Sequence, residues 1–258
     1  MARLLRILWL TALQQVQSDP LKVQFTQQMK AIARPSGAHT VILVDSSGSI
    51  GPDVWSKETI PVVKGFVKAL CGPQNFVSIV KYSNFAEIVQ TPTTDLKAAL
   101  GSAEKMSFLG GGTDTTQGFN LAETALPSMD DQGTRNVIHI SDGLPNDFGL
   151  ACKTALRLIL RDITILGIGV GSGFNLMQLK QLSSTGYSVQ VKDWKELLDL
   201  IKRYEEEAKN FGFDDSDAID LRVDVSKPGD GMLRMGFLDP LNLQITIYNN
   251  RERDTNTA

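Results

Sequence analysis

The sequence predicts an α/β protein with a doubly wound, mainly parallel central sheet and helices on both faces, a Rossmann-like arrangement. From residue 39 to about residue 210, short apolar runs alternate with longer amphipathic runs. The short runs, such as "HTVILVD" and "ITILGIGVG", are continuously apolar and rich in β-branched residues. Such runs are typical of strands that are buried on both faces. Their alternation with helices favours parallel pairing, because parallel strands need crossover connections.

The apolar pattern places each element of this sheet along the chain. Strands are expected at 39–45, 75–83, 86–92, 135–142, 163–171 and 187–191, and helices at 56–70, 93–106, 118–126, 148–160, 174–184 and 194–210. Pro61 lies within the first of these helices, and a proline there should begin or kink the helix. Thr94 is the predicted N-cap of the second helix.

The chain is expected to have three parts: a leader at 1–37, the α/β domain at 38–210, and a C-terminal part at 211–258. The C-terminal part begins with an acidic linker and ends in a polar tail. Between them, apolar and polar residues alternate in two runs around a third short segment. This pattern predicts a short antiparallel β extension with one apolar face.

The leader has two predicted features. It begins with basic residues and an apolar stretch, as secretory signals do, although Arg6 interrupts the stretch and no A-x-A cleavage site follows. An amphipathic N-terminal helix is the alternative. Further along, Phe25, Met29 and Ile32 have helical spacing, which predicts a helix near 21–33.

Composition narrows the classes of function. The chain has 258 residues, 42% of them apolar, which suffices for one large domain and a small appendage. A net charge of −3 gives no basic face for nucleic acid. No apolar run approaches the ~20 residues of a membrane span. Cys71 and Cys152 form no CxxC pair, so we expect free thiols and no zinc–cysteine site.

Oxygen-bearing side chains gather where predicted strands end. Asp45, Ser47 and Ser49 follow the first strand, Asp142 ends the fourth, and Thr113 lies in the glycine-rich loop "FLGGGTDTTQG". Ligands of doubly wound sheets bind at the carboxyl ends of the strands, so these side chains should meet at one edge. Hydroxyls and carboxylates are hard ligands that suit Mg²⁺, Mn²⁺ or Ca²⁺ and not zinc or copper. Taken alone, the Asp–Ser–Ser cluster is also compatible with a helix N-cap and its turn.

These motifs together resemble the von Willebrand factor type A domain, in the form of the inserted domains of integrins. The resemblance rests on D-x-S-x-S after the first strand, the threonine of "GGGTDT" and the D-G after the fourth strand. It covers roughly residues 38–210, and "VKYS" and "ILGIGVG" agree with it. The departures are Pro61, the strands predicted after residue 210 and the absence of cysteines flanking the domain.

The resemblance implies a complete metal-ion-dependent adhesion site. Ser47 and Ser49 would bind the metal through their hydroxyls, and Thr113 would join them in the ligand-bound state. Asp45 and Asp142 would hold coordinated waters or move in and out of the coordination sphere. If the direct ligands are mostly neutral, the metal keeps much of its charge and attracts a carboxylate from outside. The expected partner is therefore a protein that presents a Glu or Asp side chain.

The sequence thus predicts a non-enzymatic, divalent-metal-dependent protein-binding domain for adhesion or for matrix or receptor recognition, secreted or at the cell surface. One alternative is a cytoplasmic scaffold that uses the same domain to assemble a complex. Another is a metal-dependent hydrolase, but Ser47 stands where related phosphatases have a second aspartate, and His39 and His139 belong to strands. "GIGVGSG" lacks the GxGxxG register of dinucleotide sites. The final helix has an apolar face, formed by Leu197, Leu198, Leu200 and Ile201, that could repack if the helix shifts.

Overall fold

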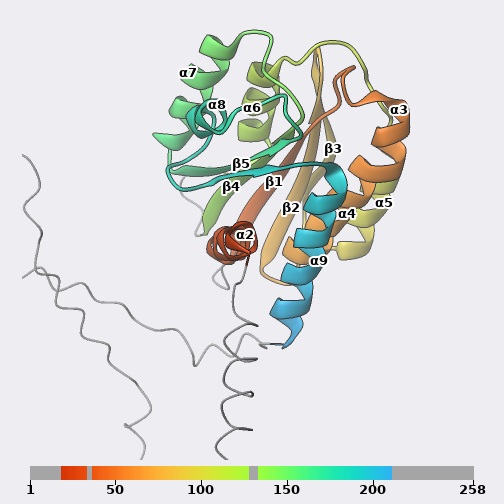
Figure 1. Ribbon diagram of the computed structural model, residues 1–258. Helices are drawn as coiled ribbons and strands as arrows, with labels where there is room; N and C mark the ends of the chain where they lie inside the picture. The colour runs from red at the N-terminus through yellow and green to blue at the C-terminus, as the bar shows by residue number, and fades with distance from the viewer. Residues whose placement is uncertain (1–18, 34–36, 128–132, 211–258) are drawn as a thin grey trace, which may run out of the picture. The chain divides into compact units, whose positions relative to one another are not determined.

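The computed structural model describes residues 19–33, 37–127 and 133–210 (Figure 1). The predicted signal sequence and the predicted β extension at 211–258 lie outside these residues. The central sheet has six strands in the order β3-β2-β1-β4-β5-β6. They are β1 (Ala38–Asp45), β2 (Asn75–Tyr82), β3 (Ala86–Thr93), β4 (Thr134–Ser141), β5 (Ile163–Val170) and β6 (Ser188–Val191). Only the β2–β3 pair is antiparallel, which confirms the predicted doubly wound, mainly parallel sheet.

Helices cover both faces of this sheet (Figure 1). In chain order they are α2 (Pro20–Ile32), α3 (Gly51–Val54), the π-helical turn η1 (Trp55–Thr59), α4 (Ile60–Leu70), α5 (Leu96–Glu104), α6 (Thr115–Thr124), α7 (Phe148–Ile159), α8 (Leu176–Gln181) and α9 (Trp194–Asn210). One face carries α6, α7 and α8, and the other carries α2, α4, α5 and α9 (Figure 1). Every helix predicted from the apolar pattern is present.

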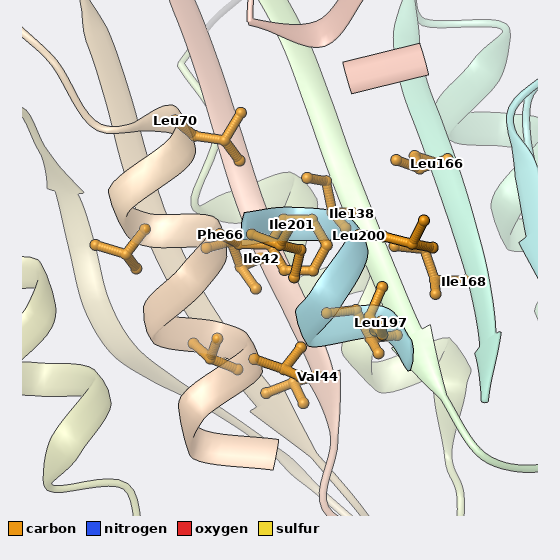
Figure 2. Close-up of a cluster of buried hydrophobic side chains, with 14 of the residues drawn as sticks. Ile42, Val44, Phe66, Leu70, Ile138, Leu166, Ile168, Leu197, Leu200 and Ile201 are labelled. Carbon is orange, nitrogen blue, oxygen red and sulfur yellow. The ribbon is translucent and has the colours of Figure 1, made fainter. Parts of the chain in front are cut away.

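Successive residues of β1 supply two separate cores, because side chains alternate across a strand. Val41 and Leu43 pack with residues of α6 and α7 on one face. Ile42 and Val44 pack on the other face with side chains of α4 and α9 (Figure 2). All four side chains are fully buried. The continuous apolar run in the sequence is therefore required by a strand that is covered on both sides.

The first predicted helix forms in three consecutive pieces. The chain passes from α3 through the π-helical turn η1 into α4, in which Pro61 is the second residue. The residues before Pro61 are already helical, and the Ile60 N–H bonds to the Trp55 carbonyl in the π-helical pattern. Proline lacks an N–H and crowds the carbonyl of the preceding turn, so the break in the α-helical pattern directly before Pro61 fits a proline at this position. The prediction that Pro61 begins or kinks the helix is confirmed.

The predicted cap at Thr94 is wrong, because the N-cap of α5 is Asp95. The Asp95 carboxylate accepts hydrogen bonds from the backbone N–H groups of Lys97 (2.8 Å) and Ala98 (3.0 Å). The helix therefore begins at Leu96, one residue after Asp95. An aspartate caps at least as well as a threonine, and its position directly before the helical residues decides between them.

Helix α2, which lies in the segment predicted as a leader, belongs to the packed core. The predicted helix near 21–33 is confirmed, and its apolar residues Phe25, Met29 and Ile32 are fully buried. The Gln24 side chain donates to the Ser188 carbonyl (2.8 Å), at the start of β6. The compact fold therefore includes residues that precede position 38.

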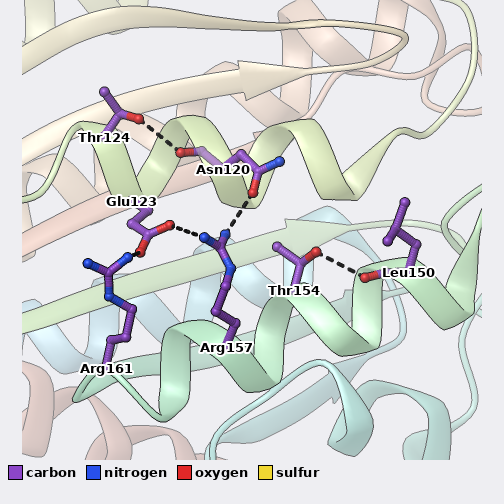
Figure 3. Close-up of polar contacts among 7 residues, drawn as sticks. All are labelled: Asn120, Glu123, Thr124, Leu150, Thr154, Arg157 and Arg161. Atoms are coloured by element: carbon purple, nitrogen blue, oxygen red, sulfur yellow. Dashed lines mark hydrogen bonds and ion pairs between the residues drawn. The ribbon is translucent and has the colours of Figure 1, made fainter.

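A network of charged side chains joins α6 to α7 at the surface (Figure 3). Glu123 pairs with Arg157 at 2.9 Å and also with Arg161, while Arg157 donates to the Asn120 carboxamide at 2.7 Å. Both arginines are about half exposed, so solvent screens these ion pairs and each contributes at most about 1 kcal/mol.

Within the ranges described, no helix has the length and apolar character needed to cross a membrane.

Candidate metal centre

Asp45 ends β1 and is fully buried at the carboxyl edge of the sheet. One of its carboxylate oxygens accepts the backbone N–H of Ser47 (2.7 Å), and the other accepts the Ser141 hydroxyl (2.5 Å). Burial raises the pKa of Asp45 to about 6, in spite of the hydrogen bonds from Ser141 and Ser47, which lower it. The structure thus places a fixed carboxylate where its charge has lost most of its hydration.

Ser47, Ser49 and Asp142 form a chain of oxygens beside Asp45. The hydroxyl oxygens of Ser47 and Ser49 are 3.1 Å apart, and the Ser49 hydroxyl donates to Asp142 over 2.8 Å. Burial also raises the pKa of Asp142 above its ordinary value. The structure therefore brings together four of the five predicted residues from the ends of β1 and β4.

Thr113 arrives on the glycine-rich loop, which is bound to the residues between Asp45 and Ser49. The backbone N–H of Gly48 donates to the Gly111 carbonyl (2.8 Å), and that of Gly110 donates to the Ser46 carbonyl (2.9 Å). Among the described residues, however, no hydrogen bond joins the Thr113 hydroxyl to the other four. The glycine-rich loop therefore lies against the cluster, but the Thr113 side chain is not hydrogen-bonded to it.

Asn84 and Asn146, which belong to none of the sequence motifs, hold the backbone around Thr113. The Asn84 carboxamide accepts the N–H of Gly112 (2.8 Å), and the Asn146 carboxamide accepts the N–H of Thr113 (3.1 Å). The Asn146 N–H also donates to the Thr113 carbonyl (2.9 Å). A Cβ at Gly112 would lie 2.6 Å from the Asn146 side chain, so a larger residue here would displace that carboxamide. The sequence signal was an asparagine shortly after each of two strand ends.

A buried polar pair lies under the cluster, on the α6 side of the sheet. The Tyr82 hydroxyl and His139 Nε2 are 2.7 Å apart, and both side chains are fully buried. Burial lowers the pKa of His139 to about 3, so the ring is neutral at physiological pH. As predicted, His139 belongs to a strand, β4, and its side chain is part of the core. An enclosed neutral imidazole that already contacts Tyr82 is poorly placed to act as a general acid or base on a bound substrate.

The oxygen spacing fits a hard divalent cation. In an octahedral Mg²⁺ site with bonds of about 2.1 Å, adjacent ligand oxygens lie about 3 Å apart. The Ser47–Ser49 and Ser49–Asp142 oxygen pairs, at 3.1 and 2.8 Å, have this spacing. No group of three or more His, Cys, Asp or Glu side chains suitable for a metal occurs in the part of the chain that the structure describes. Any cation here would therefore depend on the serine and threonine hydroxyls as well as on the two carboxylates.

The comparisons with known proteins point to one class. Residues 40–144 match the family model of the von Willebrand factor type A domain. This match and the sheet topology support a von Willebrand factor type A domain in the chain. Sporozoite surface protein 2 of Plasmodium yoelii yoelii is 26% identical over 145 residues, which cover 52% of this chain and 18% of that protein. The chain thus spans about a fifth of the length of that curated relative.

Two solved structures have a similar fold. Proximal thread matrix protein 1 from the mussel byssus is 21% identical, with a TM-score of 0.60 over 67% of this chain and 48% of the mussel chain. A manganese-loaded TRAP protein from Plasmodium vivax is 22% identical, with a TM-score of 0.53 over 66% of this chain and 74% of the other. A further structure of the mussel protein has a zinc-occupied metal-ion-dependent adhesion site. At these sequence identities, the similarity to solved structures establishes the fold and nothing about function.

Proposed function

We propose that this chain binds a divalent cation through Asp45, Ser47, Ser49, Thr113 and Asp142, and that the loaded site binds a Glu or Asp side chain of a partner protein. The observation that carries the proposal is the oxygen spacing of about 3 Å along Ser47, Ser49 and Asp142, which matches adjacent ligands of one small cation. A carboxylate and hydroxyl set of this kind is typical of hard-metal sites.

The charges of the site indicate what its residues contribute. Asp45 is held by Ser141 and Ser47 and cannot turn away, so its buried charge is available to a cation that approaches the cluster. The serine hydroxyls are neutral, and a bound dication would keep enough charge to accept an outside carboxylate at an open coordination position. The loop with Thr113 borders the same cluster and could complete the set by a small movement.

Mg²⁺ and Mn²⁺ are the proposed ions, with Ca²⁺ as a third candidate. The manganese-loaded Plasmodium vivax protein and the zinc-occupied mussel protein have similar folds. The mussel protein holds zinc in its metal-ion-dependent adhesion site, whereas ligand hardness led us to expect no zinc at the site of this chain. A metal titration of this chain should therefore include zinc.

Adhesion or surface recognition is the proposed biological role, without catalysis. The similar proteins include a sporozoite surface protein and a matrix protein of a byssal thread, which supports a secreted or cell-surface location for this chain. A cytoplasmic scaffold would use the same site, and cleavage of the N-terminal segment would separate the two. For a hydrolase, the site would need a general acid or base, and His139 is buried and neutral.

Calorimetric titration of the full chain with Mg²⁺, Mn²⁺, Ca²⁺ and Zn²⁺ tests the metal site. We expect one ion per chain and a loss of affinity of about tenfold or more in Ser49→Ala, because even ligand-supporting residues contribute that much. Ser56→Ala, which removes an exposed hydroxyl bound to the Asp53 carbonyl, is the matched control. Absence of binding, or equal affinity in both variants, would contradict the proposal. Capture of surface proteins in Mg²⁺ and not in EDTA would then test partner binding.

A further inference from the structure

A cavity of about 330 Å³ adjoins the candidate metal centre, and Ser49 and Asp142 line both. Its other walls come from α3 and η1, from the loop after β5, and from the turn between β6 and α9. A partner side chain that reaches the cation would therefore place its neighbouring residues beside this cavity. Because the two sites share residues, the cavity is positioned to contact the residue next to the partner's carboxylate.

The cavity wall is built by the glycine-rich segment "GVGSG", which the dinucleotide interpretation did not explain. A Cβ at Gly173 would lie 1.9 Å from the Asp142 carbonyl oxygen, so the loop after β5 packs directly against the metal-site loop. The Gln190 side chain donates to the carbonyls of Gly171 (3.2 Å) and Phe174 (2.8 Å). The wall is therefore fixed by hydrogen bonds before any ligand binds.

The lining is apolar inside and carries an excess of negative charge. Ile50, Val170 and Trp194 are buried apolar residues, each at most 6% exposed. Among the residues that the structure describes, three carboxylates line the cavity, on Glu58, Asp142 and Asp193, against the single ammonium of Lys192. Even if a cation offsets Asp142, negative charge remains in excess. A long basic side chain, with an apolar stem and a charged end, fits this combination.

Glu58 is the carboxylate of this lining that is free to take a new partner. Asp193 accepts the N–H of Glu196 (2.8 Å) at the start of α9, and Asp142 accepts the Ser49 hydroxyl. Within the described residues, the Glu58 side chain makes no hydrogen bond or ion pair. Glu58 lies in the π-helical turn η1, and such turns occur frequently at functional sites.

We propose that this cavity binds an arginine or lysine side chain of the partner, with Glu58 as the main charged contact. The inference rests on the proposed function, because it adds a basic residue next to the acidic residue that the metal would bind. The partner's recognition element would then be an adjacent acidic–basic pair. Arginine is favoured over lysine, because its planar group pairs with carboxylates through two hydrogen bonds.

The cavity can be tested without metal. ¹⁵N-labelled full chain in EDTA is titrated with Nα-acetyl-arginine methylamide and with its citrulline analogue, which has nearly the same shape and no charge. We expect the arginine compound to shift the amide signals of Ser172, Lys192 and Trp194, and the citrulline compound to leave them unchanged. Glu58→Gln should weaken arginine binding about threefold to fivefold, the range of a partly exposed ion pair. Glu206→Gln, at an exposed glutamate of α9, should have no effect. Equal shifts by citrulline, or an unchanged Glu58→Gln, would overturn the inference.

A second titration separates this inference from the proposed metal function. The probes are the capped dipeptides Glu–Arg and Glu–citrulline, each measured in Mg²⁺ and in EDTA. We expect Mg²⁺ to tighten binding of Glu–Arg, and Glu–citrulline to bind more weakly. An arginine preference in EDTA with no gain from Mg²⁺ would leave the cavity inference standing and refute the metal function. A gain from Mg²⁺ without any arginine preference would refute the cavity inference alone.

Discussion

The Ser141 hydroxyl donates to the Asp45 carboxylate over 2.5 Å and links the ends of the neighbouring strands β4 and β1. This contact and the Ser47 N–H fix both carboxylate oxygens. Burial nevertheless dominates and raises the pKa of Asp45 to about 6. The folded protein therefore keeps an unfavourable buried charge near neutral pH, in a position where a cation would relieve it.

The first prediction concerns the pH dependence of stability. Because the pKa of Asp45 is higher in the folded chain than its ordinary value near 4, the folded state holds the proton more tightly between pH 4 and 6. Stability is lost as pH rises through this window, by up to about 3 kcal/mol. Asp45→Asn lacks this loss. In EDTA, its free energy of unfolding in urea should exceed that of the wild type by an amount that grows from pH 4 to 7.

His139 changes the stability with pH in the opposite direction to Asp45. A comparison of the wild type with Asp45→Asn removes this effect. The pKa of His139 is lowered to about 3, so its contribution to stability is lost as pH falls from about 6.5 towards 3. Wild type and Asp45→Asn share this change, and their difference isolates Asp45. Asp199→Asn, at an exposed carboxylate, should show no such pH-dependent difference. A difference that is constant with pH would contradict the prediction.

The second prediction is that Mg²⁺ reverses this destabilisation. A ligand that binds only the folded state stabilises it in proportion to the logarithm of its concentration above Kd. The melting temperature of the wild type should therefore rise with Mg²⁺ at pH 7.5. Asp45→Asn should be more stable than the wild type in EDTA and should gain little from the metal. Equal gains in both proteins would place the cation elsewhere.

Much of the fold could be predicted because local and global signals agree in it. The apolar residues of β1 are buried on both faces of the sheet. The helical spacing of Phe25, Met29 and Ile32 places them together on the buried face of α2. The exact N-cap residue of a helix was harder to predict from the sequence. Thr94 and Asp95 are both good capping residues, and only the point where α5 begins, at Leu96, selects Asp95.

The sequence predicted that Asp45, Ser47, Ser49 and Asp142 lie close together, but it did not predict the residues that support them. The serine and aspartate oxygens belong to motifs next to strand ends, and strand order brings those ends together. Asn84 and Asn146 belong to no motif, because their role depends on the three-dimensional path of the glycine-rich loop. The role of Glu58 likewise depends on the π-helical turn, which apolar periodicity does not reveal.

The third prediction is that Asn146 positions Thr113 for metal binding. Asn146→Ala removes the carboxamide that accepts the Thr113 N–H, while the backbone bond between the same residues remains. We expect Mg²⁺ affinity to fall about tenfold or more, as for other residues that orient metal ligands. Calorimetry measures the loss, and circular dichroism checks the fold. Asn120→Ala, in the α6–α7 network, is the control and should bind Mg²⁺ normally. Unchanged affinity in Asn146→Ala would show that the loop needs no such support.

The last prediction is that α2 is a structural part of the domain. Phe25 is fully buried, and its ring lies 6.4 Å from that of Phe66 in α4. Phe25→Ala should therefore lower the free energy of unfolding by about 3–5 kcal/mol, the usual cost of emptying a buried aromatic site. Val23→Ala, two residues earlier on the exposed side of α2, should cost well under 1 kcal/mol. A chain truncated to begin at residue 38 should unfold at lower urea concentration than the full chain, because it leaves the core that α2 covers open to water. Equal stability of Phe25→Ala and Val23→Ala would mean that α2 does not contribute to the stability of the domain.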